Sequence, residues 1–399
     1  MLFELILAMG AGIIAGTFTG LAPGIHINLV AAFLTSSLTI LAFAPPLALA
    51  AFIIAMAITH TFIDFIPSIY LGAPDEETFL SVLPGHELLR QGRGHEAVLL
   101  TLCGCACGAI ILLLISPFFY FIAPILQQKL YLFLPFILIF ITSYIIFRED
   151  RWLPAIIVFV LAGFLGYATL NLPINQPLLP LLTGLFGVSS LVLSIKDKTS
   201  LEKQEITSLR DLVLPKKEIK NVFLGTLLVS PFFSFLPALG AGYSTLIASE
   251  IWDNSRKGFL VLIGAMNTLV MGASFILVYS ISKARTGAAA ALKEIIPKIT
   301  FSETIILVLV IIISSIVSLI LGIIISKICA KHISLVPYQK LSLVVIVLLC
   351  ALVLAFSHLL GLIVLITSAA LGIFAIQSKI KRTHLMGCLL VPTIIYYLA

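Results

Sequence analysis

Long runs of apolar residues follow one another along most of the chain. A bilayer core about 30 Å thick is crossed by a helix of roughly 20 apolar residues. Runs of this kind occur at 46–70, 98–123, 130–147, 152–170, 176–195, 258–282, 302–326, 340–356, 358–377 and 383–398. The pattern predicts an all-α polytopic membrane protein with about ten transmembrane helices.

Two further apolar stretches contain an internal break. Residues 2–44 break at Pro23-Gly24, and residues 221–251 break between Pro237 and Gly242. Each stretch predicts two helices that meet at a broken tip, either as a spanning hairpin or as a re-entrant pair. Non-helical backbone at membrane depth is tolerated only inside protein or beside water. We therefore expect both tips to lie in the interior.

One polar stretch divides the chain into two halves. Residues 196–220 carry seven basic and five acidic side chains, which predicts a charged cytoplasmic linker between a first transmembrane repeat, 1–195, and a second, 221–399. Each half begins with a broken pair and continues with a long helix that is polar in its middle. Residues 57–61 then correspond to residues 264–268. This order of parts predicts two inverted-topology repeats.

Composition supports the membrane class. Sixty per cent of the residues are hydrophobic, 11% are charged and the mean hydropathy is +1.19. A soluble domain has about 25% charged residues, so a soluble enzyme, a disordered chain and a nucleic-acid-binding module are excluded. Most of the Lys and Arg residues in short loops fall on the linker side, as the positive-inside rule requires. Lys283 and Arg285 depart from it. The start of the chain has Glu4 and no basic run, which favours a membrane segment over a cleaved signal peptide.

In the sequence, Asp64 is the only charged residue that lies well inside one of these long apolar stretches. Carboxylates in the bilayer are rare and usually functional. His60 precedes it by one helical turn, so the two share a face. The pair predicts a site that couples transport to H⁺ or Na⁺. The alternatives are a structural His–Asp pair and a neutral Asp64.

The broken tips predict a substrate site, because a restarted helix presents backbone N–H groups to anions. The alternative is that Gly and Pro merely permit a tight hairpin. The candidate substrate-binding residues, at the tips and in the facing helices, are Pro23, Gly24, His26, Asn28, Thr61, Pro237, Gly240, Gly242, Tyr243, Ser244, Asn267 and Thr268.

Residues 72–97 predict a cytoplasmic amphipathic segment, or a gate over the substrate site. Asp75 favours a helix start there. Cys103, Cys105 and Cys107 alternate along a helix, so they do not converge on one metal ion. No catalytic or metal-binding motif is present. We expect no enzyme activity and no cofactor, apart from Na⁺ as a possible coupling ion.

Two stretches, GTFTGLAPGIHINL at 16–29 and THTFIDFIPSIYLGAPDEETFLSVLPGHELLRQGRGHEA at 59–97, resemble the large permease subunit of tripartite tricarboxylate transporters. They look closest to the archaeal branch of that family, long labelled a domain of unknown function. The matching positions are Gly16, Gly20, Pro23, Gly24, Pro67, Gly72, Pro74, Thr78, Gly85, Gly92, Arg93 and Ala97. Asp75 falls within the same segment.

The resemblance implies a multi-pass permease of the cell membrane that takes up a small organic anion, such as a di- or tricarboxylate, with a cation. It also implies two partners, a small membrane subunit and an extracytoplasmic binding protein. Two other functions stay open. A polyprenyl-phosphate translocase needs a cationic residue near the tips, where the sequence has none. A non-transporting scaffold leaves Asp64 unexplained.

Overall fold

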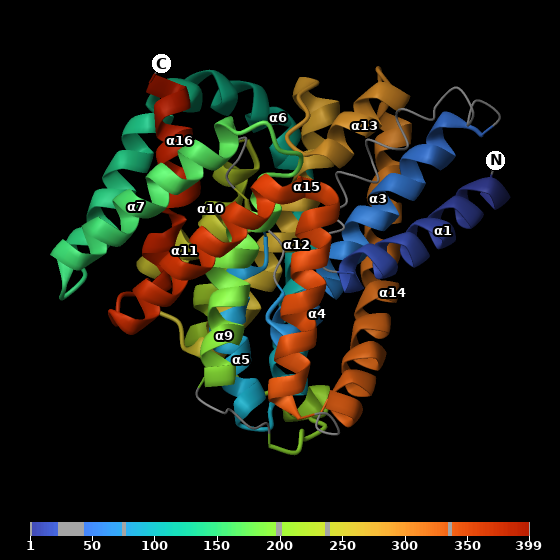
Figure 1. Cartoon of the computed structure of the whole chain (residues 1–399). Helices are drawn as coiled ribbons and strands as arrows, with labels where there is room; N and C mark the ends of the chain where they lie inside the picture. Colours follow the sequence, from blue (N-terminus) through green and yellow to red (C-terminus); the bar gives the residue numbers. More distant parts are fainter. Residues whose placement is uncertain are drawn as a thin grey trace.

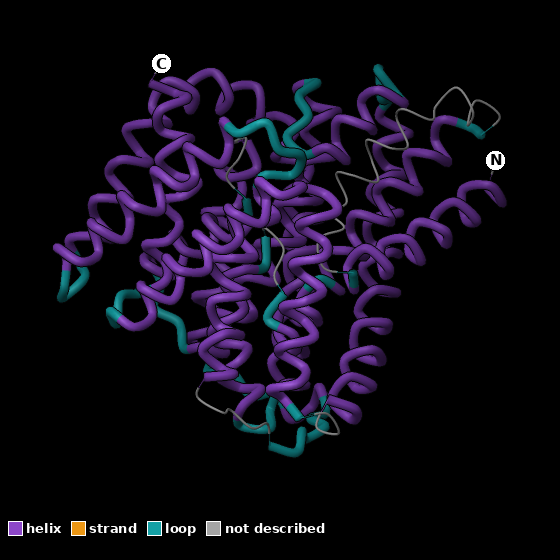
Figure 2. The backbone as a smooth tube through the Cα atoms, in the orientation of Figure 1, coloured by secondary structure: helices purple, strands orange, loops and turns teal. Residues whose placement is uncertain are grey.

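The computed structural model describes residues 2–22, 44–73, 77–196, 202–235, 240–333 and 337–398. In these residues the chain is helical, with loops between the helices and no strand (Figures 1 and 2). The helices of the first half are α1 (Leu2–Leu21), α3 (Pro46–Ile63), α4 (Phe65–Leu71), η1 (Phe79–Ser81), α5 (Val82–Arg90), α6 (Gly94–Phe147), α7 (Trp152–Asn171), α8 (Leu178–Leu182), η2 (Thr183–Val188) and α9 (Ser189–Lys196).

The remaining helices follow the charged segment. They are η3 (Leu209–Asp211), α10 (Lys216–Phe235), α11 (Ala241–Ile251), α12 (Arg256–Ile281), α13 (Gly287–Ile295), α14 (Phe301–Ile333), α15 (Tyr338–Gln377), η4 (Arg382–Met386) and α16 (Gly387–Leu398). Eight segments of the described part are long and apolar enough to cross a membrane, which confirms the polytopic helical class.

One predicted pair of spans is continuous in the structure, and a second pair meets at a kink. The stretches 98–123 and 130–147 belong to the single helix α6, which contains three internal prolines and bends across the top of the molecule in Figure 1. The stretches 340–356 and 358–377 together form α15. This helix is interrupted at His358, whose backbone φ of 57° is not helical. Ser357 donates a hydrogen bond to the carbonyl of Asn175 there, at 2.8 Å.

Helix directions show how the halves are related. Along α1 and α3, Gly12 lies against Phe52 and Gly20 against Ile63, so the two helices run parallel. Along α10 and α12, Glu218 contacts Ser255 and Gly225 contacts Leu262, so these helices also run parallel. Each half thus begins with the same arrangement.

The two arrangements run in opposite directions. Ile58, Thr61 and Asp64 of α3 lie beside Gly272, Thr268 and Asn267 of α12, respectively, so α3 and α12 are antiparallel. In addition, α6 packs along α12 while α14 packs along α3. Each long helix is therefore covered by the span that follows the other long helix. This is the relationship that an inverted repeat requires. The boundary at the charged linker stays a prediction.

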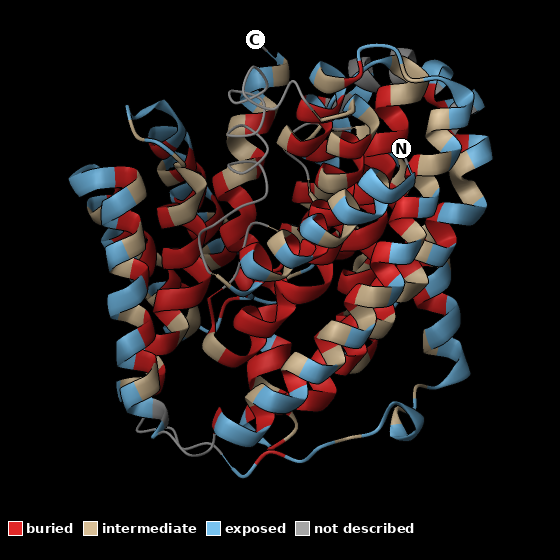
Figure 3. Ribbon diagram, turned by 90° about the vertical axis from the view of Figure 1, so that its right-hand side faces the viewer, coloured by how far each residue is buried: buried red, intermediate tan, exposed pale blue. Residues whose placement is uncertain are grey.

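Burial separates interior helices from peripheral ones (Figure 3). Every residue in the most apolar stretch of α12 is buried, whereas α7, α14 and the described part of α15 expose large apolar side chains. Apolar surface of this extent is unfavourable in water but suits contact with lipid. The chain is therefore built as a multi-pass membrane protein with α3 and α12 at its centre.

Candidate functional site

The helix predicted at 46–70 is found as one span, Pro46–Leu71, in which α3 passes into α4 at Asp64. Pro67 has no backbone N–H, so the carbonyl of Ile63 loses the donor that a regular helix would give it. The Asp64 side chain is 4% exposed. The sequence thus places a buried carboxylate next to a backbone carbonyl that lacks its usual helical donor.

Asn267, in the middle of α12, is a direct partner of this carboxylate. Its Nδ2 donates to Asp64 Oδ2 at 3.1 Å and to the carbonyl of Thr61 at 3.4 Å. The hydroxyls of Thr61 and Thr268 are 3.1 Å apart. The structure therefore brings four of the predicted site residues into contact at the crossing of the two central helices.

His60, one helical turn before Asp64 in α3, reaches α1. Its Nδ1 is 3.0 Å from Thr19 Oγ1 of α1, and the ring is buried. Next to it, Ser318 of α14 donates to the hydroxyl of Thr59 at 2.9 Å. We call His60, Thr61, Asp64, Asn267 and Thr268 the polar centre, and it joins α1, α3 and α12.

The second broken tip restarts at Gly240, immediately before α11. The backbone N–H of Ala241 donates to Glu77 Oε2, from the loop before η1. A Cβ atom on Gly240 would collide with the same carboxylate. Since Gly240 has an ordinary extended backbone, the glycine is required by the close approach of Glu77 and not by its φ angle.

A cavity of about 220 Å³ opens beside this tip. We call it the tip cavity; its lining includes Glu77, Gly240, Tyr243, Arg285, Thr286 and Thr393. The first turn of α13 also faces it, because Thr286 is the N-cap of that helix and Gly287 lines the cavity. Two helix N-termini and an arginine therefore converge on one cavity together with the carboxylate of Glu77, and these donors suit an anion.

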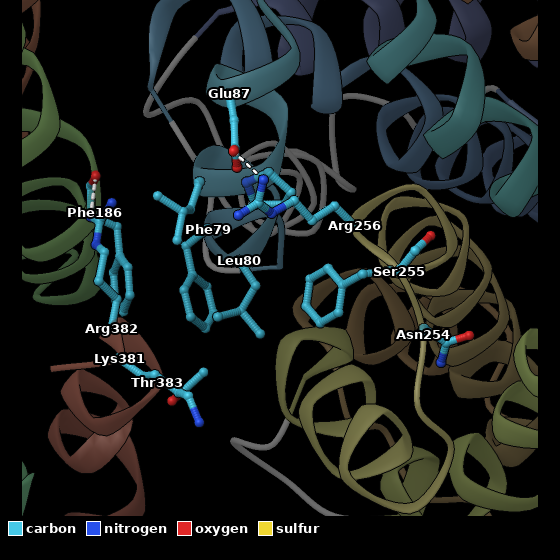
Figure 4. Close-up of a pocket in the computed structure, with 13 residues that line it drawn as sticks. Phe79, Leu80, Glu87, Phe186, Asn254, Ser255, Arg256, Lys381, Arg382 and Thr383 are labelled. Carbon is cyan, nitrogen blue, oxygen red and sulfur yellow. Dashed lines mark hydrogen bonds and ion pairs between the residues drawn. The ribbon is translucent and has the colours of Figure 1, made fainter. Parts of the chain in front are cut away.

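A larger cavity, of about 540 Å³, lies at the other end of α11 (Figure 4). We call it the Arg382 cavity; its lining includes Phe79, Glu87, Phe186, Ser255, Arg256 and Arg382. Arg256 forms an ion pair with Glu87 at its edge. Three cationic side chains, among them Lys381, face an otherwise largely apolar space.

Arg382 is buried, at 8% exposed, and several hydrogen bonds hold its guanidinium group in place. It donates to the carbonyls of Leu185 and Phe186 and to the hydroxyl of Ser190 at 2.7 Å. These carbonyls belong to η2, a π-helical turn. Burial lowers the pKa of Arg382 to about 10, so the guanidinium stays charged at neutral pH.

Phe79 separates the two cavities. Its ring lies 4.5 Å from that of Phe186 and directly over Gly242, where a Cβ atom would approach it to 2.7 Å. Glu77 lines the tip cavity and Phe79 lines the Arg382 cavity, two residues apart on one segment. The segment 77–81 is thus the partition between them.

The remaining tip residues have mainly structural contacts. The hydroxyl of Ser244 donates to the carbonyl of Ala241 in its own helix, at 2.8 Å. Tyr243 lines the tip cavity, and its hydroxyl donates to the carbonyl of Met386 at 3.4 Å. Seven candidates lie outside the described residues: Pro23, Gly24, His26, Asn28, Pro74, Asp75 and Pro237.

The glycines singled out in the sequence are packing and turn positions. Gly16 and Gly20 bring α1 against α3, and Gly85 lies under Ile69. Gly72 and Gly92 have positive φ angles of 63° and 74°, which an L side chain rarely adopts.

The polar residues of this segment form local contacts. Thr78 lies 2.7 Å from Ser68, between hydroxyl oxygens. Arg93 and Lys257 both pair with Glu96, at 2.6 and 2.8 Å. Within the described ranges no three His, Cys, Asp or Glu side chains group as metal ligands.

Sequence reasoning missed Glu77 as a candidate site residue and did not place Arg285 at a broken tip. Glu77 falls in the segment interpreted as a helix start, and its contact with Ala241 joins residues 164 positions apart. Arg285 did carry a signal, because it departs from the positive-inside rule. In the structure Arg285 lines the tip cavity.

Fold and site together define a multi-pass membrane protein with the architecture of a transporter. The sequence matches the model of the tripartite tricarboxylate transporter TctA family over residues 6–387, and the chain belongs to that family. An uncharacterized protein of Methanocaldococcus jannaschii is 33% identical over 399 residues, covering 97% of each chain. No solved structure matches the chain.

Proposed function

We propose that this permease is a secondary active transporter that moves a small organic anion, of the di- or tricarboxylate class, across the cell membrane. The observation that carries the proposal is the tip cavity, where Arg285 and the N-termini of α11 and α13 converge. Oriented N–H groups and a guanidinium are the donors that carboxylates prefer. Because the chain belongs to a family of transporters, we favour a transported anion over an enzyme substrate as the ligand of this cavity.

The polar centre supplies the coupling step in this proposal. Asp64 with His60 binds H⁺ or Na⁺, and Asn267, Thr61 and Thr268 orient the carboxylate. Alternating access requires the two repeats to move relative to each other. A carboxylate buried where the repeats cross changes its surroundings during this movement, so ion binding and movement are coupled. Substrate enters through the tip cavity and leaves through the Arg382 cavity, on the side with the basic loops.

Partners follow from the family. Tripartite transporters work with a binding protein and a small membrane subunit, so we propose the same two kinds of partner here. The side of the membrane that carries the tip cavity is then the side on which a binding protein delivers substrate.

One observation favours a second candidate. A lipid-phosphate translocase requires a cation near a broken tip, and Arg285 lines the same cavity as Gly240. The anion chemistry is shared between a carboxylate and a phosphate headgroup, so a ligand comparison separates the two functions.

The test is thermal unfolding of the purified protein with citrate, succinate, inorganic phosphate and a short-chain polyprenyl phosphate. Each is added with and without Na⁺, at acidic and neutral pH. A ligand that binds the folded state raises the midpoint by mass action. We expect a carboxylate shift that depends on Na⁺ or pH, followed by uptake of the same anion into proteoliposomes. A shift with the lipid phosphate alone would replace the proposed substrate class.

A further inference from the structure

The carboxylate of Glu77 occupies the N-terminus of α11. Its Oε2 accepts the hydrogen bond of Ala241 N–H, and the space where Gly240 would carry a side chain is filled by the same group. Glu77 does not belong to α11. It arrives from the loop before η1, 164 positions earlier in the chain. A side chain of this chain therefore already fills the position in which an anion would bind.

The surroundings of Glu77 are those expected for a ligand carboxylate. Arg285 and the start of α13 line the same cavity, with the hydroxyls of Tyr243, Thr286 and Thr393. The cavity beside Glu77 measures about 220 Å³, which is below the roughly 300 Å³ at which small-molecule sites usually begin. Movement of the Glu77 carboxylate away from the Ala241 N–H would increase the volume of the cavity by that of one carboxylate group.

We propose that Glu77 is a tethered competitor of the transported anion, an inference that rests on the proposed function. A substrate carboxylate replaces Glu77 as the acceptor of the Ala241 N–H, because one N–H cannot donate fully to two carboxylates. Two carboxylates at the same helix N-terminus would also repel each other. Phe79 is two residues further along the same segment. When Glu77 moves away from Ala241, Phe79 therefore also loses its contacts with Gly242 and Phe186. Occupancy of the tip cavity is thereby linked to opening of the partition towards the Arg382 cavity.

The competition predicts that substrate binds more tightly when Glu77 is weakened. Glu77→Gln keeps the shape and removes the charge, and Glu77→Ala empties the cradle. A helix N-terminus stabilises the carboxylate that occupies it, and a substrate carboxylate must displace that group. We therefore expect the Kd for citrate or succinate to fall by about tenfold in Glu77→Ala and by less in Glu77→Gln.

A second readout is rescue by a free carboxylate. Glu77→Ala loses a contact at the start of α11, so its midpoint of thermal unfolding falls without ligand. Acetate is expected to restore that midpoint, while chloride at the same ionic strength does not. The wild type is expected to respond to neither. Glu250→Gln is the matched control, because Glu250 is a carboxylate of the opposite end of α11 that pairs with Arg148 at 2.9 Å.

The outcomes separate the two proposals. If the wild type binds a carboxylate and both Glu77 variants bind it equally well or more weakly, Glu77 is not a competitor and the transport function stands. If neither the wild type nor Glu77→Ala binds any carboxylate, the proposed function fails and the competition fails with it. Because Glu77→Gln preserves the volume of the side chain, poor folding of Glu77→Ala leaves the affinity test intact.

Discussion

Asn267 Nδ2 lies 3.1 Å from Asp64 Oδ2, and this hydrogen bond joins the middle of α12 to the junction of α3 and α4. The two long helices run antiparallel and hold equivalent places in the two halves, so the contact lies where the halves cross. An amide is neutral, and it orients the carboxylate without supplying the positive charge that a bound cation would supply. In the proposed function, this carboxylate binds the coupling ion.

Asp64→Asn is expected to abolish coupled uptake while leaving the fold intact. The new amide keeps the size of the side chain and an oxygen that accepts from Asn267, but it binds no proton and attracts Na⁺ weakly. Loss of a proton-transferring group commonly lowers rates by on the order of 100-fold or more. The measurement is anion uptake into proteoliposomes under imposed H⁺ and Na⁺ gradients.

The control for this prediction is Asp211→Asn, in the exposed η3 turn. It is expected to leave uptake unchanged. Gradient-driven uptake at the wild-type rate in Asp64→Asn would remove Asp64 from the coupling step, although its role as a partner of Asn267 would remain.

Gly16→Ala is expected to destabilise the protein by about 1–3 kcal/mol, the usual cost of overpacking. A Cβ atom there would approach Thr59 Cβ to 2.7 Å and would collide with the carbonyl of Met56. Because the obstacle is mostly backbone, the helices α1 and α3 must separate. Thermal unfolding in detergent measures the effect.

Gly10→Ala is the matched control, since a Cβ atom on Gly10 meets nothing within 4 Å. It is expected to be neutral or slightly stabilising, because alanine favours a helix by about 1 kcal/mol over glycine. Equal behaviour of the two variants would show that the α1–α3 contact does not depend on close approach.

Local patterns were sufficient to predict much of this fold. The lengths of the apolar runs follow from the thickness of the bilayer, and the spacing of Gly16 and Gly20 marks the face that α1 presents to α3. The correspondence of 57–61 with 264–268 anticipated the meeting of Thr61 and Thr268. These features are visible in sequence because each depends on residues within one helix or on an internal repeat.

The composition of the tip cavity was not predictable in this way. Ala241 and Glu77 are distant in sequence, and no periodicity links a loop before η1 to the start of α11. The continuous course of α6 was also missed, because polar residues separate its two apolar runs, 98–123 and 130–147, in the sequence. A polar interruption of an apolar run does not by itself end a helix.

Stability is expected to fall in mild acid through His86. Burial and the charges of Arg90 and Arg382 lower the pKa of this imidazole from 6.5 to about 3. The unfolded chain therefore binds a proton below about pH 6.5 that the folded chain does not bind. The contribution of His86 to stability is complete above this pH and decreases as the pH falls towards 3, by about 1.4 kcal/mol per pH unit.

The measurement is the midpoint of thermal unfolding between neutral pH and mild acid. His86→Gln is expected to flatten the profile, whatever it does to the midpoint at neutral pH. His332→Gln, at an exposed position near the end of α14, is expected to leave the profile unchanged. An unaltered slope in His86→Gln would assign the acid sensitivity to other groups.

Arg382→Lys is expected to destabilise the protein by about 2–3 kcal/mol, although it keeps the charge. The guanidinium reaches Leu185, Phe186 and Ser190 at once, and its carbon Cζ lies 5.2 Å from the centre of the Phe186 ring. An ammonium group cannot reproduce this planar set of donors. Each buried carbonyl that loses its donor costs about 1–3 kcal/mol.

The neighbouring Lys381 provides the comparison, because its side chain is 66% exposed and its pairing with Glu149 is a surface ion pair. Lys381→Gln is expected to change stability by less than about 1 kcal/mol. The segment η2 also carries Phe186, which contacts Phe79. Arg382→Lys is therefore further expected to slow anion uptake, even when uptake is measured at a lower temperature at which the variant is folded. Equal unfolding midpoints for Arg382→Lys and the wild type would show that η2 holds its shape without the arginine.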